Sequence, residues 1–298
     1  MCGIVGLFLK NPEMEDQLGR LLAGMLATMC ERGPDSAGFA VYGPATPGHS
    51  KITLQSPHAQ DDFAKLRATL SLEQNSDVAL SIHDTHAVLS VQSDKLDAVK
   101  AMLSAKHPSI RIMATGDAIE IYKEVGNPNE VAERFDLAHM KGTHAIGHTR
   151  MATESAVTTL GAHPFSTGAD ECLVHNGSLS NHNNLRRELI RDGMKFDTEN
   201  DTEVAASYLT WRMKQGMNLG EALEKGLEDL DGFFTFVVGT KSGFGVVRDP
   251  IACKPAVMAE TADYVAFGSE YRALAGLPGI DKAKVWEPEP ATVYFWQR

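Results

Sequence analysis

The second residue of the chain carries the side chain with the greatest chemical potential. Cys2 follows Met1 directly and precedes Gly3. An initiator methionine is commonly removed when the next side chain is small, which would leave Cys2 with both a thiol and a free α-amine. The amine has a reference pKa of about 7.7–8.0, so near neutral pH it can take the thiol proton. The position predicts a nucleophile that carries its own base. The alternative is an inert small hydrophobe at a ragged terminus.

Asn176 and Gly177 form a second group that suits acyl transfer. A side-chain amide beside an unhindered backbone N–H offers two donors to one oxyanion, each worth about 3 kcal/mol. The same Asn-Gly dipeptide is also typical of a hairpin turn. Asp201 lies where a helix is expected to begin. It is therefore a helix cap, a carboxylate that presents its second oxygen to a ligand ammonium, or both.

The composition excludes several classes of function. The chain has 298 residues, of which 43% are hydrophobic and 22% charged, enough for a substantial core. Its formal net charge of -11 argues against nucleic-acid binding. No apolar run approaches the roughly 20 residues of a membrane span, and no signal peptide is recognisable. We therefore expect a cytoplasmic protein that binds neither nucleic acid nor membrane.

The cysteines and histidines do not predict a metal site. Four cysteines are widely scattered, at Cys2, Cys30, Cys172 and Cys253. Without a CxxC pair a structural zinc site is not expected, and reduced thiols fit best. His83 and His86 have the spacing of metal ligands, but no third ligand of the right type follows them. We expect no metal.

Periodicity and turn signals indicate the elements that must position these groups. Helices are predicted near residues 11–32, 61–72, 95–105, 127–139, 184–191, 200–215 and 219–230. Strands are predicted near 3–9, 39–42, 79–82, 87–91, 110–113, 118–122, 144–146, 233–240, 243–247, 264–268 and 292–296. Residues 43–60 are rich in proline and typical of a loop. We expect one domain over 1–298, with a small α+β insert at about 61–140.

A series of short motifs follows Cys2 in a fixed order. They are Cys-Gly-Ile-Val-Gly at 2–6, Arg-Gly-Pro-Asp-Ser-Ala-Gly at 32–38, Gly-His-Thr-Arg at 147–150, Ala-Thr at 152–153, His-Pro-Phe at 163–165, His-Asn-Gly at 175–177, Asp-Thr-Glu at 201–203, Arg-Asp-Pro at 248–250, Lys-Pro at 254–255 and Phe-Gly-Ser-Glu at 267–270. In this order they resemble the class II glutamine amidotransferase family of N-terminal-nucleophile hydrolases. The resemblance covers the chain except roughly residues 45–140.

The resemblance implies both a fold and a reaction. The fold would be α+β with four layers, αββα, in which two stacked antiparallel sheets lie between helices. The reaction would be glutamine hydrolysis: Cys2 attacks the side-chain amide, and Asn176 and the Gly177 N–H hold the oxyanion. Ammonia then leaves, and water converts the thioester to glutamate.

The resemblance also implies how the substrate is held. Arg150 would pair with the α-carboxylate of glutamine through its planar fork. Asp201 would accept from the α-ammonium, and Thr153 would line the pocket. Three further residues would support the site: Arg32, Asp35 and His175. The chain departs from the family pattern at Met151, where tryptophan is frequent, and at Ala252, where glycine is usual.

Within the family, the chain resembles the separately encoded amidotransferase subunit of glutamate-synthase-like enzymes, such as N-methylglutamate synthase. That implies no cofactor in this chain and a partner synthase subunit that uses the ammonia and carries flavin and iron–sulfur groups. We expect no synthase domain after Arg298. Two alternatives remain: an amidohydrolase of a related γ-glutamyl amide, and a regulatory subunit with vestigial glutaminase whose insert binds a partner.

Overall fold

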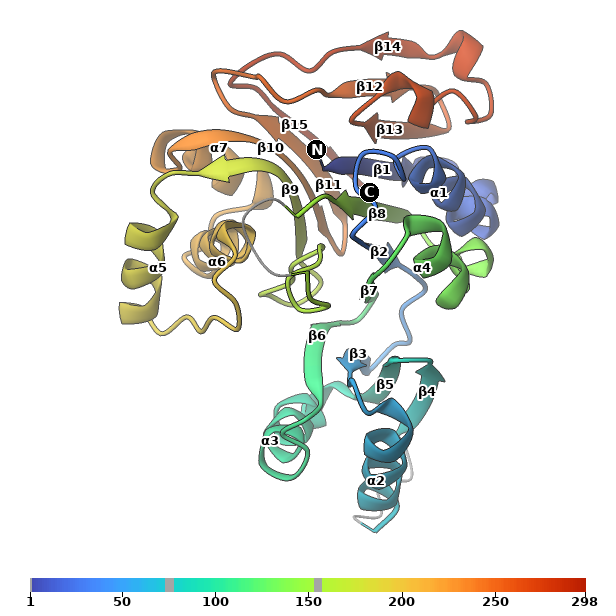
Figure 1. The fold of residues 1–298 in the computed structure, drawn as a ribbon, viewed down its shortest axis with the longest axis vertical. Coiled ribbons are helices and arrows are strands. Elements are labelled where there is room, and N and C mark those ends of the chain that lie inside the picture. The colour runs from blue at the N-terminus through green and yellow to red at the C-terminus, as the bar shows by residue number, and fades with distance from the viewer. Residues whose placement is uncertain (1, 73–77, 153–156) are drawn as a thin grey trace.

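The computed structural model describes residues 2–72, 78–152 and 157–298 (Figure 1). Its α-helices are α1 (Leu18–Ala27), α2 (Ala59–Leu72), α3 (Leu96–Lys106), α4 (Pro128–Arg134), α5 (His182–Arg191), α6 (Asp201–Lys214) and α7 (Leu219–Asp229). Its strands are β1 (Gly3–Leu9), β2 (Ser36–Tyr42), β3 (His49–Gln55), β4 (Ala79–His83), β5 (His86–Gln92), β6 (Arg111–Gly116), β7 (Ile119–Val125), β8 (His144–Arg150), β9 (Cys172–Leu179), β10 (Gly232–Thr240), β11 (Gly243–Arg248), β12 (Val257–Glu260), β13 (Tyr264–Gly268), β14 (Lys284–Trp286) and β15 (Val293–Gln297). Within these ranges no helix has the length and hydrophobicity to cross a membrane.

Two antiparallel sheets stack between helices. In the described residues, one sheet has the strand order β14-β12-β13-β1-β8-β2-β7 and the other the order β15-β11-β10-β9. Apolar residues such as Ile4, Val174 and Phe244 fill the space between the sheets. Separate apolar clusters join α1 to the outer face of the first sheet and α6 and α7 to that of the second. The predicted α+β fold with four αββα layers is confirmed.

Strand β1 occupies the middle of the larger sheet and brings the N-terminus to the centre of the molecule. It pairs with β13 on one side and with β8 on the other, where Gly3 lies opposite Thr149. Every residue of β1 is buried, because the strand is covered by the second sheet on one face and by α1 on the other. This burial explains why residues 3–9 form a nearly continuous apolar run.

The insert differs in extent from the expected residues 61–140. A third sheet in the described residues, with the order β4-β5-β3-β6, runs from residue 49 to residue 116 and carries α2 and α3. The sequence β-α-β-β-α-β in this order is the ferredoxin-like arrangement. It begins at β3, within the predicted loop, because β3 pairs with both β5 and β6. It ends before β7, which pairs with β2 in the main sheet. Figure 1 shows the insert at one end of the long axis.

Other local predictions were also wrong. Asn176-Gly177 is not a hairpin turn, because both residues pair with β10 inside strand β9. The helix predicted over 11–32 is a 3-10 turn at Pro12–Gln17 followed by α1, which ends at Ala27. Asn200, not Asp201, caps α6: its side chain accepts from the Thr202 N–H at 2.9 Å. Asp201 is thereby the first residue of that helix.

Candidate active site

Three distant parts of the chain meet at Cys2. The Cys2 carbonyl oxygen accepts hydrogen bonds from Arg32 Nε at 3.1 Å and from Asn176 Nδ2 at 3.4 Å. The residue is half-buried, and its thiol is free. Arg32 follows α1, and Asn176 lies in the second sheet, so the contact bridges the two sheets. The predicted nucleophile and one predicted oxyanion donor are therefore neighbours.

An ion pair supports the Cys2 backbone, and it joins Arg32, a predicted supporting residue, to Glu270, for which no role was predicted. Arg32 Nη1 donates to Glu270 Oε1 at 2.6 Å, and the Arg32 side chain is 9% exposed. The Arg32 hydrogen bond is the main reason why the pKa of Glu270 is lowered. Beside Glu270, Ser269 Oγ accepts from the Ile4 N–H at 2.9 Å. Ser269 and Glu270 both belong to the Phe-Gly-Ser-Glu motif at 267–270, which was the feature of the sequence that pointed to them.

Gly177 lies where strand β9 passes very close to strand β10. Its φ is +152°, and a Cβ built on it would lie 1.9 Å from the Phe233 carbonyl oxygen. The same Cβ would lie 2.8 Å from His175 Nε2. Only glycine tolerates both the backbone angle and the close approach. Asn176, one residue earlier, is only 5% exposed, and its side-chain amide donates to the Cys2 carbonyl oxygen.

Asp201 connects the start of α6 to strand β9. Its Oδ2 accepts from the Leu179 N–H at 3.0 Å, and its Oδ1 lies 3.7 Å from His175 Nδ1. Burial by itself would raise the pKa of Asp201. The interactions with His175 and the Leu179 N–H outweigh that effect and lower the pKa to about 2. Asp201 is therefore a carboxylate at neutral pH.

A buried network behind Asn176 joins both sheets to α6. His148 Nε2 lies 3.0 Å from the His175 carbonyl oxygen, in hydrogen-bond contact. Thr202 Oγ1 is hydrogen-bonded to His163 Nε2 at 2.7 Å and to His175 Nδ1 at 3.1 Å. The rings of His148 and His163 stack at 4.0 Å. Burial lowers the pKa of His148 to about 3 and that of His163 well below its usual value, so both rings are neutral at pH 7.

Arg150 ends strand β8, the neighbour of β1, and is almost completely buried. Its carbonyl oxygen accepts from the Asp35 N–H at 3.1 Å. The Asp35 carboxylate then accepts from the Ala152 N–H at 2.8 Å, so Asp35 shapes the backbone on both sides of Arg150. Met151, where the family pattern favours tryptophan, is exposed. Thr153, predicted to line the pocket, lies outside the described residues.

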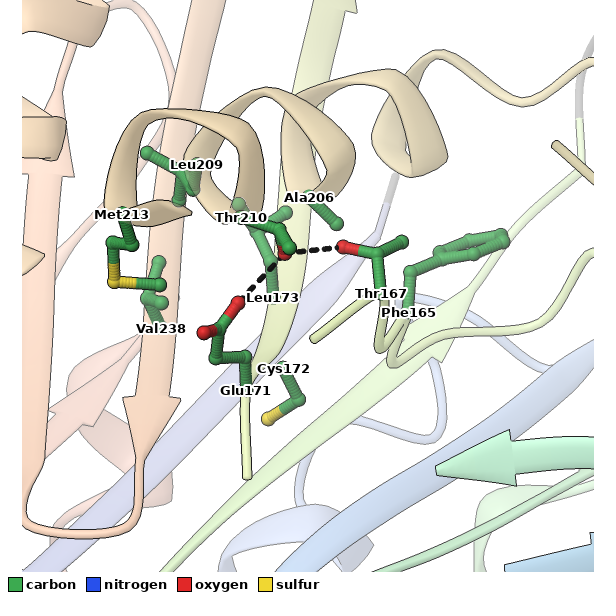
Figure 2. A pocket seen from close by; sticks show the side chains of 10 residues that line it. All are labelled: Phe165, Thr167, Glu171, Cys172, Leu173, Ala206, Leu209, Thr210, Met213 and Val238. Atoms are coloured by element: carbon green, nitrogen blue, oxygen red, sulfur yellow. Dashed lines mark hydrogen bonds between the residues drawn. The ribbon is translucent and has the colours of Figure 1, made fainter. Parts of the chain in front are cut away.

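A small cavity beneath α6 is separate from this group (Figure 2). It has a volume of about 10 Å³, room for at most one water molecule. Thr210, on α6, donates to Glu171 at 2.6 Å and is hydrogen-bonded to Thr167 at 2.7 Å. Neither Cys2 nor Arg150 lines the cavity. It is too small to hold an amino acid.

Comparison with known proteins identifies the family. A family model described as "Glutamine amidotransferase domain" matches residues 148–276. The glutamine amidotransferase-like protein GlxB of Rhizobium meliloti is 66% identical over 296 residues, which cover 99% of this chain and 98% of that protein. The chain belongs to the class II glutamine amidotransferase family. The predicted class of enzyme is confirmed with it.

Two further comparisons extend this result. A putative glutamine amidotransferase of Methanothermobacter thermautotrophicus is 33% identical to this amidotransferase over 304 residues, and the match covers 99% of each chain. The structure of glutamine phosphoribosylpyrophosphate amidotransferase from B. subtilis superposes with a TM-score of 0.62 at 20% identity. That match covers 99% of this chain but only 47% of the B. subtilis chain, so this amidotransferase spans about half its length. At that identity the likeness supports the fold alone.

Proposed function

We propose that this amidotransferase hydrolyses the side-chain amide of glutamine through a Cys2 thioester. The observation that carries the proposal is the contact of the Asn176 amide with Cys2. After removal of Met1, the Cys2 amine takes the thiol proton and the sulfur attacks the amide carbon. Asn176 Nδ2 and the Gly177 N–H then stabilise the oxyanion. The C–N bond breaks, ammonia leaves with the proton, and water hydrolyses the thioester to glutamate and restores the thiol.

The charges of the site support a free amino acid as the substrate. The Asp201 carboxylate is ionised because its pKa is about 2, so it can accept from an α-ammonium. The Arg150 guanidinium supplies the opposite charge for an α-carboxylate, with two parallel hydrogen bonds. An amide that lacks these two groups would interact with neither charged side chain. This pair favours an amide whose α-amine and α-carboxylate are both free, as they are in glutamine. A γ-glutamyl amide shares both groups, so the substrate panel described below has to separate the two.

We further propose that a separate synthase subunit consumes the ammonia. The two relatives described above match this chain over 98% and 99% of their own lengths, which leaves little room for a synthase domain in them. A glutamate-synthase-like partner that carries flavin and iron–sulfur groups fits this arrangement, with N-methylglutamate synthase as the model. The four free thiols are compatible with the cytoplasm as its compartment.

The purified protein tests the reaction directly. Glutamate release from glutamine is measured for the wild type, for Cys2→Ala, and for Cys253→Ala, whose exposed thiol serves as the matched control. We expect only Cys2→Ala to lose activity, and N-terminal sequencing to show Cys2 as the first residue. Glutamine hydrolysis by Cys2→Ala, or retention of Met1 in the active protein, would refute the mechanism.

Two further experiments test the substrate and the partner. A panel of glutamine and γ-glutamyl amides is expected to show the highest kcat/KM for glutamine.

A gentle pull-down is expected to recover a flavin-containing synthase subunit. Full glutaminase activity without any co-purifying subunit would contradict the proposed partner. A separate labelling experiment tests whether the site is active: failure of Cys2 to react with a glutamine-mimicking electrophile would favour a vestigial site.

A further inference from the structure

Residues 158–164 form a loop, here called the cover loop, that lies beside the Arg150 guanidinium at Gly161. A Cβ built on Gly161 would lie 3.5 Å from Arg150 Nη1, so the loop backbone is in near contact with the charged group. Arg150 itself is only 8% exposed. The position of the cover loop therefore sets the space in which a carboxylate can reach the guanidinium.

Lys123, on strand β7, holds the backbone of the cover loop. Its Nζ donates to the carbonyl oxygens of Leu160 at 3.2 Å, Ala162 at 2.8 Å and Pro164 at 3.1 Å. An ammonium has three donors, so these bonds use its full capacity. The side chain is buried, and this burial lowers the pKa of Lys123 to about 7. The three carbonyl oxygens around Nζ are nevertheless suited to its protonated form.

Glu124, the next residue on β7, connects the cover loop to the insert. Its Oε1 accepts hydrogen bonds from Thr159 Oγ1, in the cover loop, and from the Val125 N–H. Its Oε2 accepts from Thr85 Oγ1 at 3.0 Å. Thr85 lies in the turn between strands β4 and β5 of the insert. Glu124 is 8% exposed, so the two threonine contacts compete little with water.

We propose that Glu124 is a positioning residue through which the β4–β5 turn of the insert sets how tightly Arg150 binds the substrate carboxylate. This inference rests on the proposed role of Arg150 in binding the glutamine carboxylate. Thr159 of the cover loop holds one oxygen of the carboxylate, and Thr85 of the insert holds the other, which also lies 3.9 Å from Arg134 Nη1 on α4. Loss of the Thr85 contact lets the carboxylate rotate, and Thr159 and the cover loop shift with it. Because a coupling free energy is reciprocal, glutamine binding in turn orders the β4–β5 turn.

Threonine-to-valine variants test the relay without changing side-chain shape. Thr159→Val and Thr85→Val each remove one hydroxyl, and Thr69→Val is the matched control. Thr69 also lies in the insert, but its hydroxyl bonds to Lys65 and His107 rather than to β7. The full-length protein is labelled at Cys2 with 6-diazo-5-oxonorleucine over a range of concentrations, which separates half-saturation from the maximal rate. Iodoacetamide, which has no carboxylate, reports the intrinsic reactivity of Cys2 when its alkylation is followed at Cys2 by mass spectrometry, apart from that of the exposed Cys253.

We expect the half-saturating concentration to rise about fivefold in Thr159→Val and about threefold in Thr85→Val, in line with single hydrogen bonds. The double variant is expected to resemble Thr159→Val alone, because the relay is already interrupted. The maximal rate, the iodoacetamide rate and the thermal midpoint should remain close to wild type, as should every value for Thr69→Val.

Two results would overturn the inference: an unchanged half-saturation in Thr85→Val, or full additivity of the two variants. If Thr85→Val fails to fold, Glu124→Gln replaces it and should itself raise the half-saturating concentration. If Thr159→Val fails to fold, Glu124→Gln replaces it, and Thr85→Val should have no further effect in that background. Arg150→Lys separates this inference from the proposed function. If Arg150→Lys leaves half-saturation unchanged, the glutamine site itself is wrong; if only the threonine variants have no effect, the relay alone is wrong.

Discussion

Leu179 and Asp201 are joined by a 3.0 Å hydrogen bond from the strand N–H to the helix carboxylate. Because Asn200 caps the helix, the Asp201 carboxylate is left to bind outside it. This hydrogen bond therefore fixes the position of the Asp201 carboxylate, at the start of α6, relative to β9. Strand β9 carries Asn176 and Gly177. The candidate ammonium acceptor, Asp201, is thereby held at a fixed distance from the candidate oxyanion donors, Asn176 and Gly177.

Asp201→Asn is expected to weaken glutamine binding without unfolding the protein. The asparagine oxygen can still accept from Leu179, but the negative charge for the α-ammonium is lost. We expect KM for glutamine to rise about 10- to 100-fold, the value of a charged hydrogen bond, with a smaller change in kcat. Asp192→Asn is the control, since Asp192 is an exposed acceptor for Trp211 Nε1. An unchanged KM would remove Asp201 from substrate binding.

Arg32→Gln is expected to slow the reaction of Cys2 and to destabilise the fold. It removes the bond to the Cys2 carbonyl oxygen and leaves Glu270 without its most buried partner. We expect a loss of about 2–3 kcal/mol in unfolding free energy, less than the roughly 3–5 kcal/mol for a fully buried pair, because the Glu270 side chain is 32% exposed. Arg272→Gln removes the more exposed partner of Glu270 and should cost about 0.5 kcal/mol or less. Denaturant titration measures the stability of both variants, and the labelling rate measures the reactivity of Cys2. Equal effects of the two substitutions would contradict the role of Arg32 as a support for the Cys2 backbone.

Gly177→Ala is expected to abolish turnover. The new methyl group would lie against the Phe233 carbonyl oxygen and push β9 away from β10, so that both oxyanion donors move. Loss of one such donor alone lowers kcat about 10²- to 10³-fold. Gly193→Ala is the matched control, because Gly193 also has positive φ but has open space around its Cα. We expect that control to lose about 1 kcal/mol of stability and no activity; normal turnover in Gly177→Ala would exclude the oxyanion role.

Acid is expected to destabilise the protein below pH 6.5 through its buried histidines. Burial lowers the pKa of His86, His144 and His148 to about 3 from an ordinary 6.5. The unfolded state therefore binds more protons between pH 6.5 and 3, and stability falls as pH falls through that window. Each such residue contributes a loss of about 2 kcal/mol between pH 7.5 and 5.

A histidine variant makes the pH prediction specific. His144→Gln should reduce the loss of unfolding free energy between about pH 7.5 and 5, which is measured by denaturant titration at each pH. His139→Gln is the control at an exposed histidine, which contacts Asp136, and it should leave the decline unchanged. An identical pH dependence in wild type and His144→Gln would show that His144 is not a neutral buried ring.

The local sequence was sufficient to predict a helix, a strand or a site residue where the environment of a residue depends on its immediate neighbours. The apolar run of residues 3–9 predicted β1, because a strand covered on both faces must be apolar throughout. The helices near 61–72, 200–215 and 219–230 were predicted from periodicity and caps. The ordered motifs behind Cys2 predicted the family and named Arg32, Asn176 and Asp201. Each of these inferences needs only residue type, spacing and order.

Pairing between distant segments was decided by the tertiary structure alone. Residues 49–55 resemble a loop in isolation and become a strand because β5 and β6 supply their hydrogen bonds. Asn176-Gly177 has the local signature of a turn, yet β10 draws it into a sheet. The partnership of Glu270 with Arg32 joins residues 238 positions apart. Such contacts depend on where the sheets bring the chain together, and the sequence by itself determined only which residues were available to make them.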